Sequence, residues 1–237
     1  MIIAHRGASY LAPENTVASV TLAWKLDSDA VEIDVHLSKD NRVMVIHDKD
    51  IKRTCSGKTN LAIAKHSSLL LRDLDAGIRK GEEFKGEKIP FLKEIIETVP
   101  EGKTLLVEIK SSVEILDHIE RVLEKYGAGK NIAFIAFDWN IIIESKKRFP
   151  DHKCYWLSES KSAVKIRIPE IRSVGLDGIN LSNKIVDQEI MGLAKANHVE
   201  VLSWTIDDPA EAKRLVDLGV AGITTNRPKW LRDEMSK

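Results

Sequence analysis

Cysteine is scarce in this sequence, whose 237 residues include only Cys55 and Cys154. Two thiols are too few for a disulfide framework, and their separation does not match the spacing of a metal-binding motif. We therefore expect a protein of a reducing compartment in which both thiols are incidental.

Long apolar runs are also lacking. No uninterrupted apolar stretch approaches the roughly 18 residues that a membrane-spanning helix requires. The apolar run at residues 1–4 is cut off by His5 and Arg6 before it reaches the length of a signal-peptide core. These absences predict a cytoplasmic, soluble protein without stable membrane association.

Neither sign of charge is in excess. Lys and Arg together number 36, as do Asp and Glu, so the formal net charge is zero. Such a balance provides no long-range field that recruits nucleic acid or anionic lipid. We therefore expect a small-molecule substrate held by a local site and no nucleic-acid partner. The sequence leaves both a monomer and a homo-oligomer open.

What the sequence does contain is an alternation of short β-branched runs with helical patterns. Strands are predicted at residues 2–5, 30–37, 42–48, 103–110, 131–137, 152–157, 177–181, 199–205 and 221–225. Helices are predicted at residues 14–26, 91–99, 113–127, 140–149, 188–197 and 209–219. This order is typical of a parallel sheet with right-handed crossovers.

Nine strands are one more than an eight-stranded barrel holds, and the second and third strands explain the excess. Only about four residues, "SKDN", join them, whereas a parallel crossover needs about a dozen or more. They must form an antiparallel hairpin, and a turn centred on Asp40 and Asn41 would place Asp34 opposite His47. We therefore predict a (β/α)8 TIM barrel with a β-hairpin after strand two.

The stretch at about residues 49–88 is polar, contains several glycines and shows only weak helical patterns. We interpret it as a small insertion subdomain over the barrel mouth. No internal repeat, low-complexity tract or interdomain linker is evident, so residues 1–237 are expected to form one domain.

Acidic residues lie near the carboxyl ends of two predicted strands. Glu32 and Asp34 share one face of the second strand, and Glu108 shares a face of the fourth with Lys110. Both faces should point into the barrel, because the alternate residues are apolar and suit the surrounding helices. Buried acids are costly unless a cation neutralises them. Pairing of each acid with a Lys or Arg is the alternative, but three together favour one divalent ion, Mg²⁺ or Ca²⁺, with Mn²⁺ as a third candidate.

Other reactive side chains end apolar runs nearby. His5 and Arg6 follow the first strand and His47 ends the hairpin, so all three are expected to reach the acids. Two imidazoles beside a metal can remove a proton from a nucleophile and give one to a leaving oxygen near neutral pH. Arg6 and Lys110 would hold a tetrahedral anion between them, which indicates a phosphoryl centre.

The motifs that carry these residues resemble those of glycerophosphodiester phosphodiesterases. In order they are "HRG…PENT", "EIDVHLSKDNRVMVIHD", "LDAG", "KIPFLKEII", "VEIK", "SWTID" and "GITTNRP", and together they extend over residues 1–228. The resemblance implies a (β/α)8 fold like that of phosphatidylinositol-specific phospholipases C. It also implies hydrolysis of glycerophosphodiesters to glycerol 3-phosphate and an alcohol, a reaction of lipid and glycerol metabolism.

The resemblance further implies roles for individual residues. The family's metal ligands match Glu32, Asp34 and Glu108, and its general acid and base match His5 and His47. The phosphate-contacting residues match Arg6 and Lys110, and a glycerol or alcohol side is implied for Phe137 and Trp204, for which a role in the barrel core is equally open. Glu14 and Asn15, from the "PENT" motif, are expected to support the site.

This sequence departs from the family pattern near its end. Asp207 replaces a common Asn, and Asn226 replaces a common Asp. We expect neither residue to contact the metal or the acid and base set, so these changes should affect substrate preference alone.

The mechanistic hypothesis is that one histidine deprotonates the nucleophile while the other protonates the departing alcohol. Attack by the glycerol 2-hydroxyl and attack by water are both open, as are the assignment of the two histidines and the alcohol group. Lys110 as a Schiff-base lysine in an aldolase is a rival function, and an inactive barrel that binds a phosphodiester or a partner protein is another. The acids favour the metal enzyme, and the presence of both histidines argues against an inactive barrel.

Overall fold

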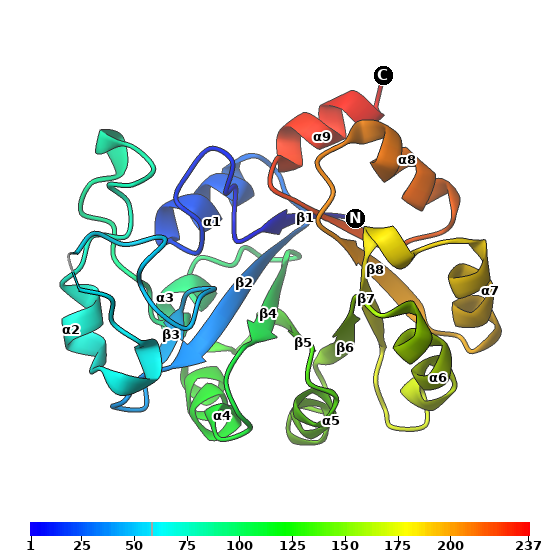
Figure 1. The fold of residues 1–237 in the computed structure, drawn as a ribbon, viewed down its shortest axis with the longest axis horizontal. Coiled ribbons are helices and arrows are strands. Elements are labelled where there is room, and N and C mark those ends of the chain that lie inside the picture. Colours follow the sequence, from blue (N-terminus) through cyan, green and yellow to red (C-terminus); the bar gives the residue numbers. More distant parts are fainter. Residues whose placement is uncertain (58) are drawn as a thin grey trace.

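Eight parallel strands close into a barrel in the computed structural model, which describes residues 1–57 and 59–237 (Figure 1). These strands are β1 (Ile2–His5), β2 (Ala30–Leu37), β4 (Thr104–Ile109), β5 (Asn131–Ala136), β6 (Lys153–Ser158), β7 (Gly178–Ser182), β8 (Glu200–Trp204) and β9 (Gly222–Thr225). The barrel closes because β1 pairs with both β2 and β9. The predicted TIM barrel is confirmed.

Helices follow the strands and surround the barrel (Figure 1). They are α1 (Val17–Lys25), α3 (Leu92–Ile96), α4 (Ile115–Tyr126), α5 (Trp139–Arg148), α6 (Lys161–Ile171), α7 (Gln188–Ala196), α8 (Pro209–Asp217) and α9 (Pro228–Met235). None of the helices in the described part of the chain is both long and apolar enough to cross a bilayer.

Two of these helices, α6 and α9, were not predicted from the sequence. In α6, Pro169 lies within the helix and Ile166 is 69% exposed, so the apolar residues do not form one clean stripe. In α9, Leu231 is fully buried among mostly polar neighbours. Both helices are stabilised by packing against the barrel more than by a pattern that can be read locally.

Strand β3 (Val43–Val45) returns antiparallel along the upper part of β2, with Val35 opposite Val45. The connection has three residues, 39–41, because the Ser38 amide donates to the Arg42 carbonyl oxygen at 3.0 Å. Asn41 has a φ of 59°, the left-handed conformation that commonly ends such a three-residue turn.

The predicted register of this hairpin is therefore wrong by one residue. The Ile46 amide donates to the Asp34 carbonyl oxygen at 3.0 Å, so Asp34 is not directly opposite His47. The third residue of the turn causes the difference. Strand β3 ends at Val45, so side chains beyond it need not alternate between the two faces of the sheet. His47 therefore still lines the barrel cavity described below, despite the shifted register.

The segment between β3 and α3 contains the short helices η1 (Ile63–Lys65), α2 (Ser68–Arg72) and η2 (Glu82–Phe84). It packs around an apolar cluster of its own, formed by Met44, Ile46, Ile51, Cys55, Ile63, Leu71, Ala76 and Ile89. In Figure 1 most of this segment is cyan and lies beside β3 at one side of the barrel. Lys58 of the predicted insertion lies outside the described residues.

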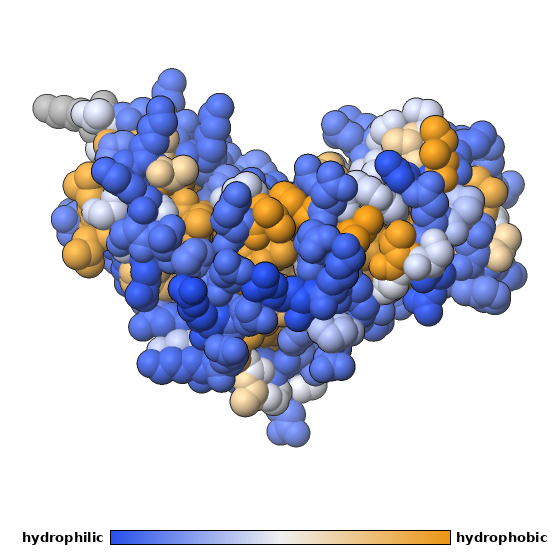
Figure 2. All heavy atoms as spheres, turned by 90° about the horizontal axis from the view of Figure 1, so that it is seen from below, coloured by the Kyte–Doolittle hydropathy of each residue, from blue (hydrophilic) through white to orange (hydrophobic). Residues whose placement is uncertain are grey.

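The inside of the barrel is divided into an apolar and a polar level. Ile3, Ala30, Leu106, Ala133, Ile135, Tyr155, Leu157 and Leu202 form a separate apolar cluster among the strands. The acids of β2 and β4 lie further along their strands than Ala30 and Leu106 do. By contrast, the outer face seen in Figure 2 is mostly hydrophilic, with hydrophobic side chains gathered toward the hollow near its centre. The acidic side chains of β2 and β4 thus lie directly above a packed apolar layer.

Removal of a core ring should measure how much the packing between strands and helices stabilises the fold. Phe134 on β5 is fully buried, and its ring centroid lies 4.8 Å from that of Phe149. Phe134→Ala should lower the free energy of unfolding by about 3–5 kcal/mol in guanidinium titrations. The control Ile166→Ala removes a side chain that is 69% exposed and should change it by less than about 0.5 kcal/mol. Equal losses in the two variants would contradict this account of the core.

Candidate active site

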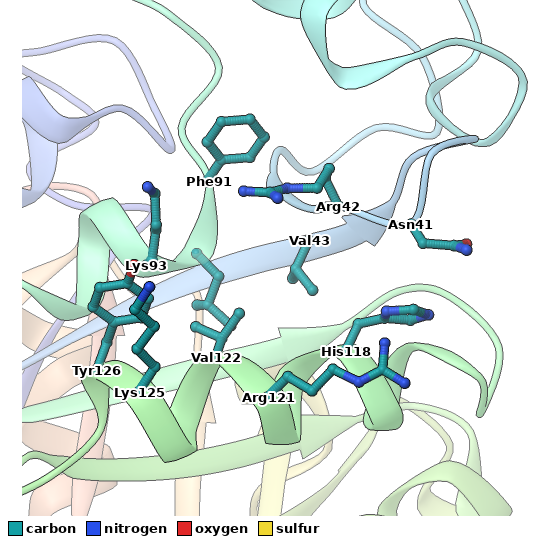
Figure 3. Close-up of a pocket in the computed structure, with 11 residues that line it drawn as sticks. Asn41, Arg42, Val43, Phe91, Lys93, His118, Arg121, Val122, Lys125 and Tyr126 are labelled. Carbon is teal, nitrogen blue, oxygen red and sulfur yellow. The ribbon is translucent and has the colours of Figure 1, made fainter.

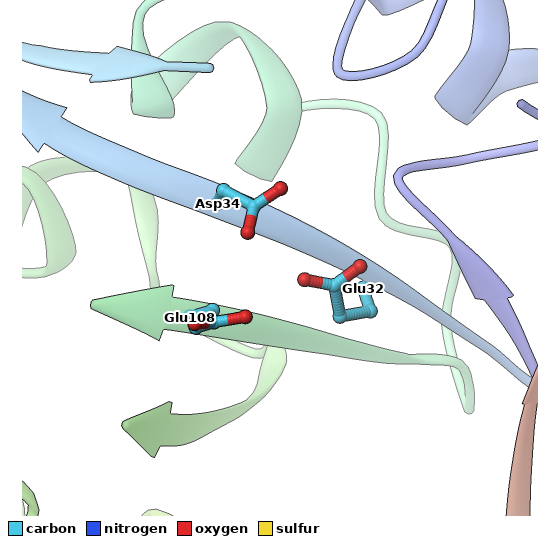
Figure 4. Close-up of side chains that lie close together, drawn as sticks. All are labelled: Glu32, Asp34 and Glu108. Atoms are coloured by element: carbon cyan, nitrogen blue, oxygen red, sulfur yellow. The ribbon is translucent and has the colours of Figure 1, made fainter. Parts of the chain in front are cut away.

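Three buried carboxylates meet at the polar level of the barrel. Glu32 and Asp34 lie on β2, and Glu108 lies on the neighbouring β4, where it is the register partner of Asp34. At most 8% of each residue is exposed, and one oxygen from each lies within 4.8 Å of the others (Figure 4). Alternation along two adjacent parallel strands places them there, as the sequence pattern predicts.

Each acid has one oxygen without a hydrogen-bond partner. Glu32 Oε2 accepts from the Arg6 amide at 3.0 Å, and Asp34 Oδ2 accepts from Asn15 Nδ2 at 2.8 Å. The second oxygens, Glu32 Oε1, Asp34 Oδ1 and Glu108 Oε1, are buried and make no hydrogen bond of regular geometry, although Lys110 Nζ forms ion pairs with those of Asp34 and Glu108. Unpaired buried oxygens are costly, and hard divalent cations prefer such ligands. The triad therefore has the chemistry to hold a metal ion.

The charges around the triad do not balance. Lys110 Nζ lies 2.5 Å from Glu108 Oε1 and 3.2 Å from Asp34 Oδ1, and Arg6 Nε lies 3.3 Å from Asp34 Oδ2. Two cations thus serve three carboxylates. Among the residues described here, Glu32 has no cationic side-chain group within ion-pair distance. Pairing with basic residues, the alternative to a metal, accounts for only part of the acidic charge.

This imbalance shifts the pKa values of the acids. Burial, together with the negative charges of Asp34 and Glu108, raises the pKa of Glu32 well above its usual range. Burial and the Asp34 charge raise the pKa of Glu108 to about 7. Burial also opposes ionisation of Asp34, but Lys110 and Arg6 outweigh it and lower that pKa. A divalent cation would reverse the shifts of the two glutamates by favouring their charged forms.

His5 ends β1 and is held by Asn226 through a hydrogen bond of 2.8 Å at Nδ1. Asn226 Nδ2 donates to Asp207 Oδ2 at 2.7 Å, so its Oδ1 is the atom that faces His5 and can only accept. His5 therefore carries its proton on Nδ1 and leaves Nε2 with a lone pair. Burial and then the Arg6 charge lower the pKa of His5 to about 4, so the ring is neutral near pH 7.

The expectation that Asn226 and Asp207 stay apart from the acid and base set is wrong. Asn226 contacts His5 directly, and Asp207 orients Asn226. Their separation in sequence hid this contact, because it forms only when β9 pairs with β1 to close the barrel. The two residues that depart from the family pattern, Asn226 and Asp207, thus form a hydrogen-bonded chain that ends at His5 Nδ1.

His47 is held by a carboxylate instead of an amide. Its Nδ1 lies 2.7 Å from Asp48 Oδ1, and Asp48 Oδ2 accepts from Arg53 Nε at 2.8 Å. Burial opposes ionisation of Asp48, but Arg53 and His47 outweigh it and lower its pKa to about 2. Asp48 therefore fixes the orientation of the His47 ring and directs its Nε2 away from the carboxylate.

Arg53 links Asp48 to Glu14, which precedes α1. Its Nη1 and Nη2 donate to Glu14 at 2.6 and 2.8 Å, and Glu14 Oε1 in turn accepts from Arg6 Nη1 at 2.9 Å. Glu14 therefore supports Arg6, while Asn15 supports Asp34 directly. Sequence reasoning missed Arg53, since it lies in the irregular segment after β3 and pairs with an acid 39 residues away.

A cavity of about 170 Å³ opens above the acids, and the predicted residues His5, Arg6, Glu32, His47, Glu108, Lys110, Phe137 and Trp204 line it. The Phe137 and Trp204 rings meet edge to face at 5.6 Å and form its aromatic wall. Asn180 and Thr224 also line it, and each has a buried side-chain oxygen without a hydrogen-bond partner. The sequence reasoning missed both, although an Asn within the apolar run "GINL" was a usable sign.

The raised pKa of Glu108 predicts a pH-dependent stability of the metal-free protein. Its folded pKa of about 7 exceeds the ordinary 4.5, so its stabilising contribution is complete below pH 4.5 and is lost as the pH rises to about 7. His5, with a lowered pKa, acts in the opposite direction, so wild type must be compared with Glu108→Gln. The quantity of interest is the free energy of unfolding of the wild type minus that of the variant. We expect this difference to decrease as the pH rises from 4.5 to about 7.

Denaturant titrations at several pH values, with chelator, check this prediction. Repetition with saturating Mg²⁺ is the control, and there the difference should rise with pH, because the ion binds the ionised carboxylate. A pH-independent difference in chelator would show that Glu108 is not perturbed as described.

Comparisons with known proteins agree with the fold. A glycerophosphodiester phosphodiesterase of Caldanaerobacter subterraneus subsp. tengcongensis is 31% identical, over 98% of this chain and 96% of that protein. The structure of an Oleispira antarctica phosphodiesterase in complex with the product sn-glycerol-3-phosphate is similar with a TM-score of 0.92 and 29% identity, covering 100% of this chain and 97% of that one.

A putative glycerophosphoryl diester phosphodiesterase from Silicibacter pomeroyi has the same fold, with a TM-score of 0.87 at 22% identity over 99% of this chain and 92% of that one. The model of the glycerophosphoryl diester phosphodiesterase family matches residues 5–230. The motifs and the match agree over nearly the whole chain. This protein therefore belongs to the glycerophosphoryl diester phosphodiesterase family.

Proposed function

We propose that this protein hydrolyses glycerophosphodiesters to glycerol 3-phosphate and an alcohol, with one divalent ion and two histidines as the catalytic groups. The observation that carries the proposal is the buried acid triad, whose three carboxylates have one oxygen each within 4.8 Å of the others beside a cavity lined by two imidazoles and two cations. The product complex of the Oleispira antarctica relative supports glycerol 3-phosphate as the product.

Glu32, Asp34 and Glu108 would hold the ion, for which Mg²⁺, Ca²⁺ and Mn²⁺ are the candidates given an all-oxygen ligand set. When bound, the ion supplies positive charge that stabilises the phosphoryl oxygens and lowers the pKa of an adjacent hydroxyl. Arg6 and Lys110 bind the remaining phosphate oxygens from opposite sides of the cavity.

His5 acts as the general base. Because Asn226 fixes its proton on Nδ1, the Nε2 lone pair is available to accept a proton, and the low pKa keeps the ring neutral before reaction. The nucleophile is either the glycerol 2-hydroxyl, which gives a cyclic phosphate that water then opens, or water itself. His5 removes the proton in both cases.

His47 acts as the general acid. Asp48 occupies its Nδ1 side, so Nε2 is the atom that presents a proton to the departing alcohol oxygen. Asp48 holds the ring in this orientation through its contact with Nδ1. Arg53 in turn holds Asp48 in place.

Lys110 is a cation here and not a Schiff-base nucleophile. Burial favours its neutral form, but the carboxylates of Asp34 and Glu108 outweigh burial and raise its pKa. A lysine that attacks a carbonyl needs the neutral amine. This geometry disfavours the aldolase alternative. We also propose a cytoplasmic location, which rests on Cys55 and Cys154 being unpaired thiols.

The two histidine roles predict different responses to the leaving group. His5→Ala and His47→Ala should each lower kcat for glycerophosphocholine by about 10² to 10⁴ while the protein stays folded. With a glycerophosphodiester of p-nitrophenol, whose anion leaves without protonation, His47→Ala should recover most of the loss and His5→Ala should not. Steady-state kinetics and circular dichroism of each variant provide the measurements.

His198→Asn is the matched control, because His198 is exposed with a φ of 54°, a conformation that Asn tolerates. It should keep wild-type rates with both substrates. Wild-type rates in either alanine variant would refute the assignment of that histidine. If the p-nitrophenol substrate restored the rate of His5→Ala and not that of His47→Ala, His5 would be the general acid and His47 the general base.

A further inference from the structure

A second cavity, of about 410 Å³, lies on the outside of the barrel and shares no lining residue with the catalytic cavity. The turn of the β2 and β3 hairpin, α3 and α4 enclose it (Figure 3). Four cationic side chains line it, namely Arg42 from the hairpin, Lys93 from α3, and Arg121 and Lys125 from α4. We refer to it as the outer groove.

The cations of the outer groove are not neutralised by the protein. Within the described residues, Arg42, Lys93, Arg121 and Lys125 have no carboxylate oxygen within 4.0 Å. Three of the acids on the same helices are engaged elsewhere, since Glu94 pairs with Arg72 and both Asp117 and Glu120 pair with Arg148. In a chain of zero net charge, positive charge is thus concentrated here.

Helix α4 sorts its charges by face. His118, Arg121 and Lys125 recur at intervals of three and four, so one face of the helix carries them toward the groove (Figure 3). Asp117 and Glu120 lie on the adjacent face, where they meet Arg148 of α5. Asp117 and Arg121 are four residues apart and could form an intrahelical ion pair. Asp117 instead pairs with Arg148, and Arg121 has no ion pair among the described residues.

Aromatic rings position these cations without removing their charge. The Arg42 guanidinium lies 4.7 Å from the Phe91 ring centroid, and the ammonium groups of Lys93 and Lys125 lie 5.9 and 5.3 Å from that of Tyr126. Such contacts orient a cation while leaving its N–H groups free to donate. The groove is therefore partly organised for an anion before one binds.

We propose that the outer groove binds a small organic anion that carries at least two phosphate groups, such as a nucleoside diphosphate. Four cations from three elements converge on a concavity large enough for a small ligand, and multiple phosphate charges match them. Phe91, Val122 and Tyr126 line the same groove, are partly exposed and provide apolar surface for the organic part. A flat membrane or a nucleic-acid duplex would not fill such a concavity. The proposal is independent of the catalytic function proposed above.

Calorimetric titration of the full-length protein with ADP, AMP and adenosine tests the proposal, in buffer without added divalent ions so that the phosphates keep their charge. We expect ADP to bind, AMP to bind at least about 10-fold more weakly, and adenosine to give no measurable heat. Arg121→Ala/Lys125→Ala should weaken ADP binding by about 10-fold or more. Both residues are exposed, so the double variant should fold normally.

Two controls locate the site. Lys184→Ala/Lys195→Ala removes two exposed cations on the opposite side of the barrel and should keep ADP affinity within about twofold. Lys110→Ala alters the catalytic cavity and should also keep it. Loss of ADP binding only in Lys110→Ala, or equal affinity in the groove variant and its control, would overturn the proposal.

Sedimentation with phosphatidylglycerol and phosphatidylcholine vesicles separates the proposal from a membrane-docking surface. The wild type should sediment equally little with both. Binding to phosphatidylglycerol vesicles that is lost in Arg121→Ala/Lys125→Ala, with no ADP binding by the wild type, would replace the small anion with a lipid surface and overturn the proposal.

Discussion

Three carboxylates lie inside the barrel, and within the described part of the chain only two cations neighbour them; this imbalance is the constraint on which the site depends. Their repulsion and desolvation raise the pKa of both glutamates, so the metal-free site stores unfavourable free energy that a divalent ion would relieve. The same ion would supply the charge stabilisation that phosphodiester hydrolysis requires. Arg6 and Lys110 partly neutralise the acids and also line the cavity.

The closed barrel brings these groups together from distant parts of the chain. His5 is backed by Asn226 across the β1 and β9 seam, and His47 reaches the cavity from beyond the β2 and β3 hairpin. The Nδ1 atom of one imidazole contacts a neutral amide and that of the other contacts a carboxylate, so the two side chains have different environments. Arg53 and Glu14 link the His47 side to Arg6 through charged hydrogen bonds.

The barrel and its acids were predictable because strand alternation and parallel pairing follow local rules that the sequence displays. Failures occurred where the outcome depended on conformation or on distant contacts. The left-handed Asn41 shifted the hairpin register by one residue, and Asn226 was placed away from His5 because 221 residues separate them. Helix α6 carries little apolar periodicity of its own, and packing determines it. Arg53 was missed for the same reason, since its partner Glu14 is identified only by the folded chain.

The most direct test is anomalous diffraction from crystals soaked in MnCl₂, for wild type and for Glu32→Gln. The account predicts one strong peak within about 2.6 Å of an oxygen from each of Glu32, Asp34 and Glu108 in the wild type, and a much weaker peak in the variant. It also predicts that the soaked protein loses turnover when the ion is removed by chelator. A manganese peak elsewhere in a protein that stays fully active in chelator would contradict the account.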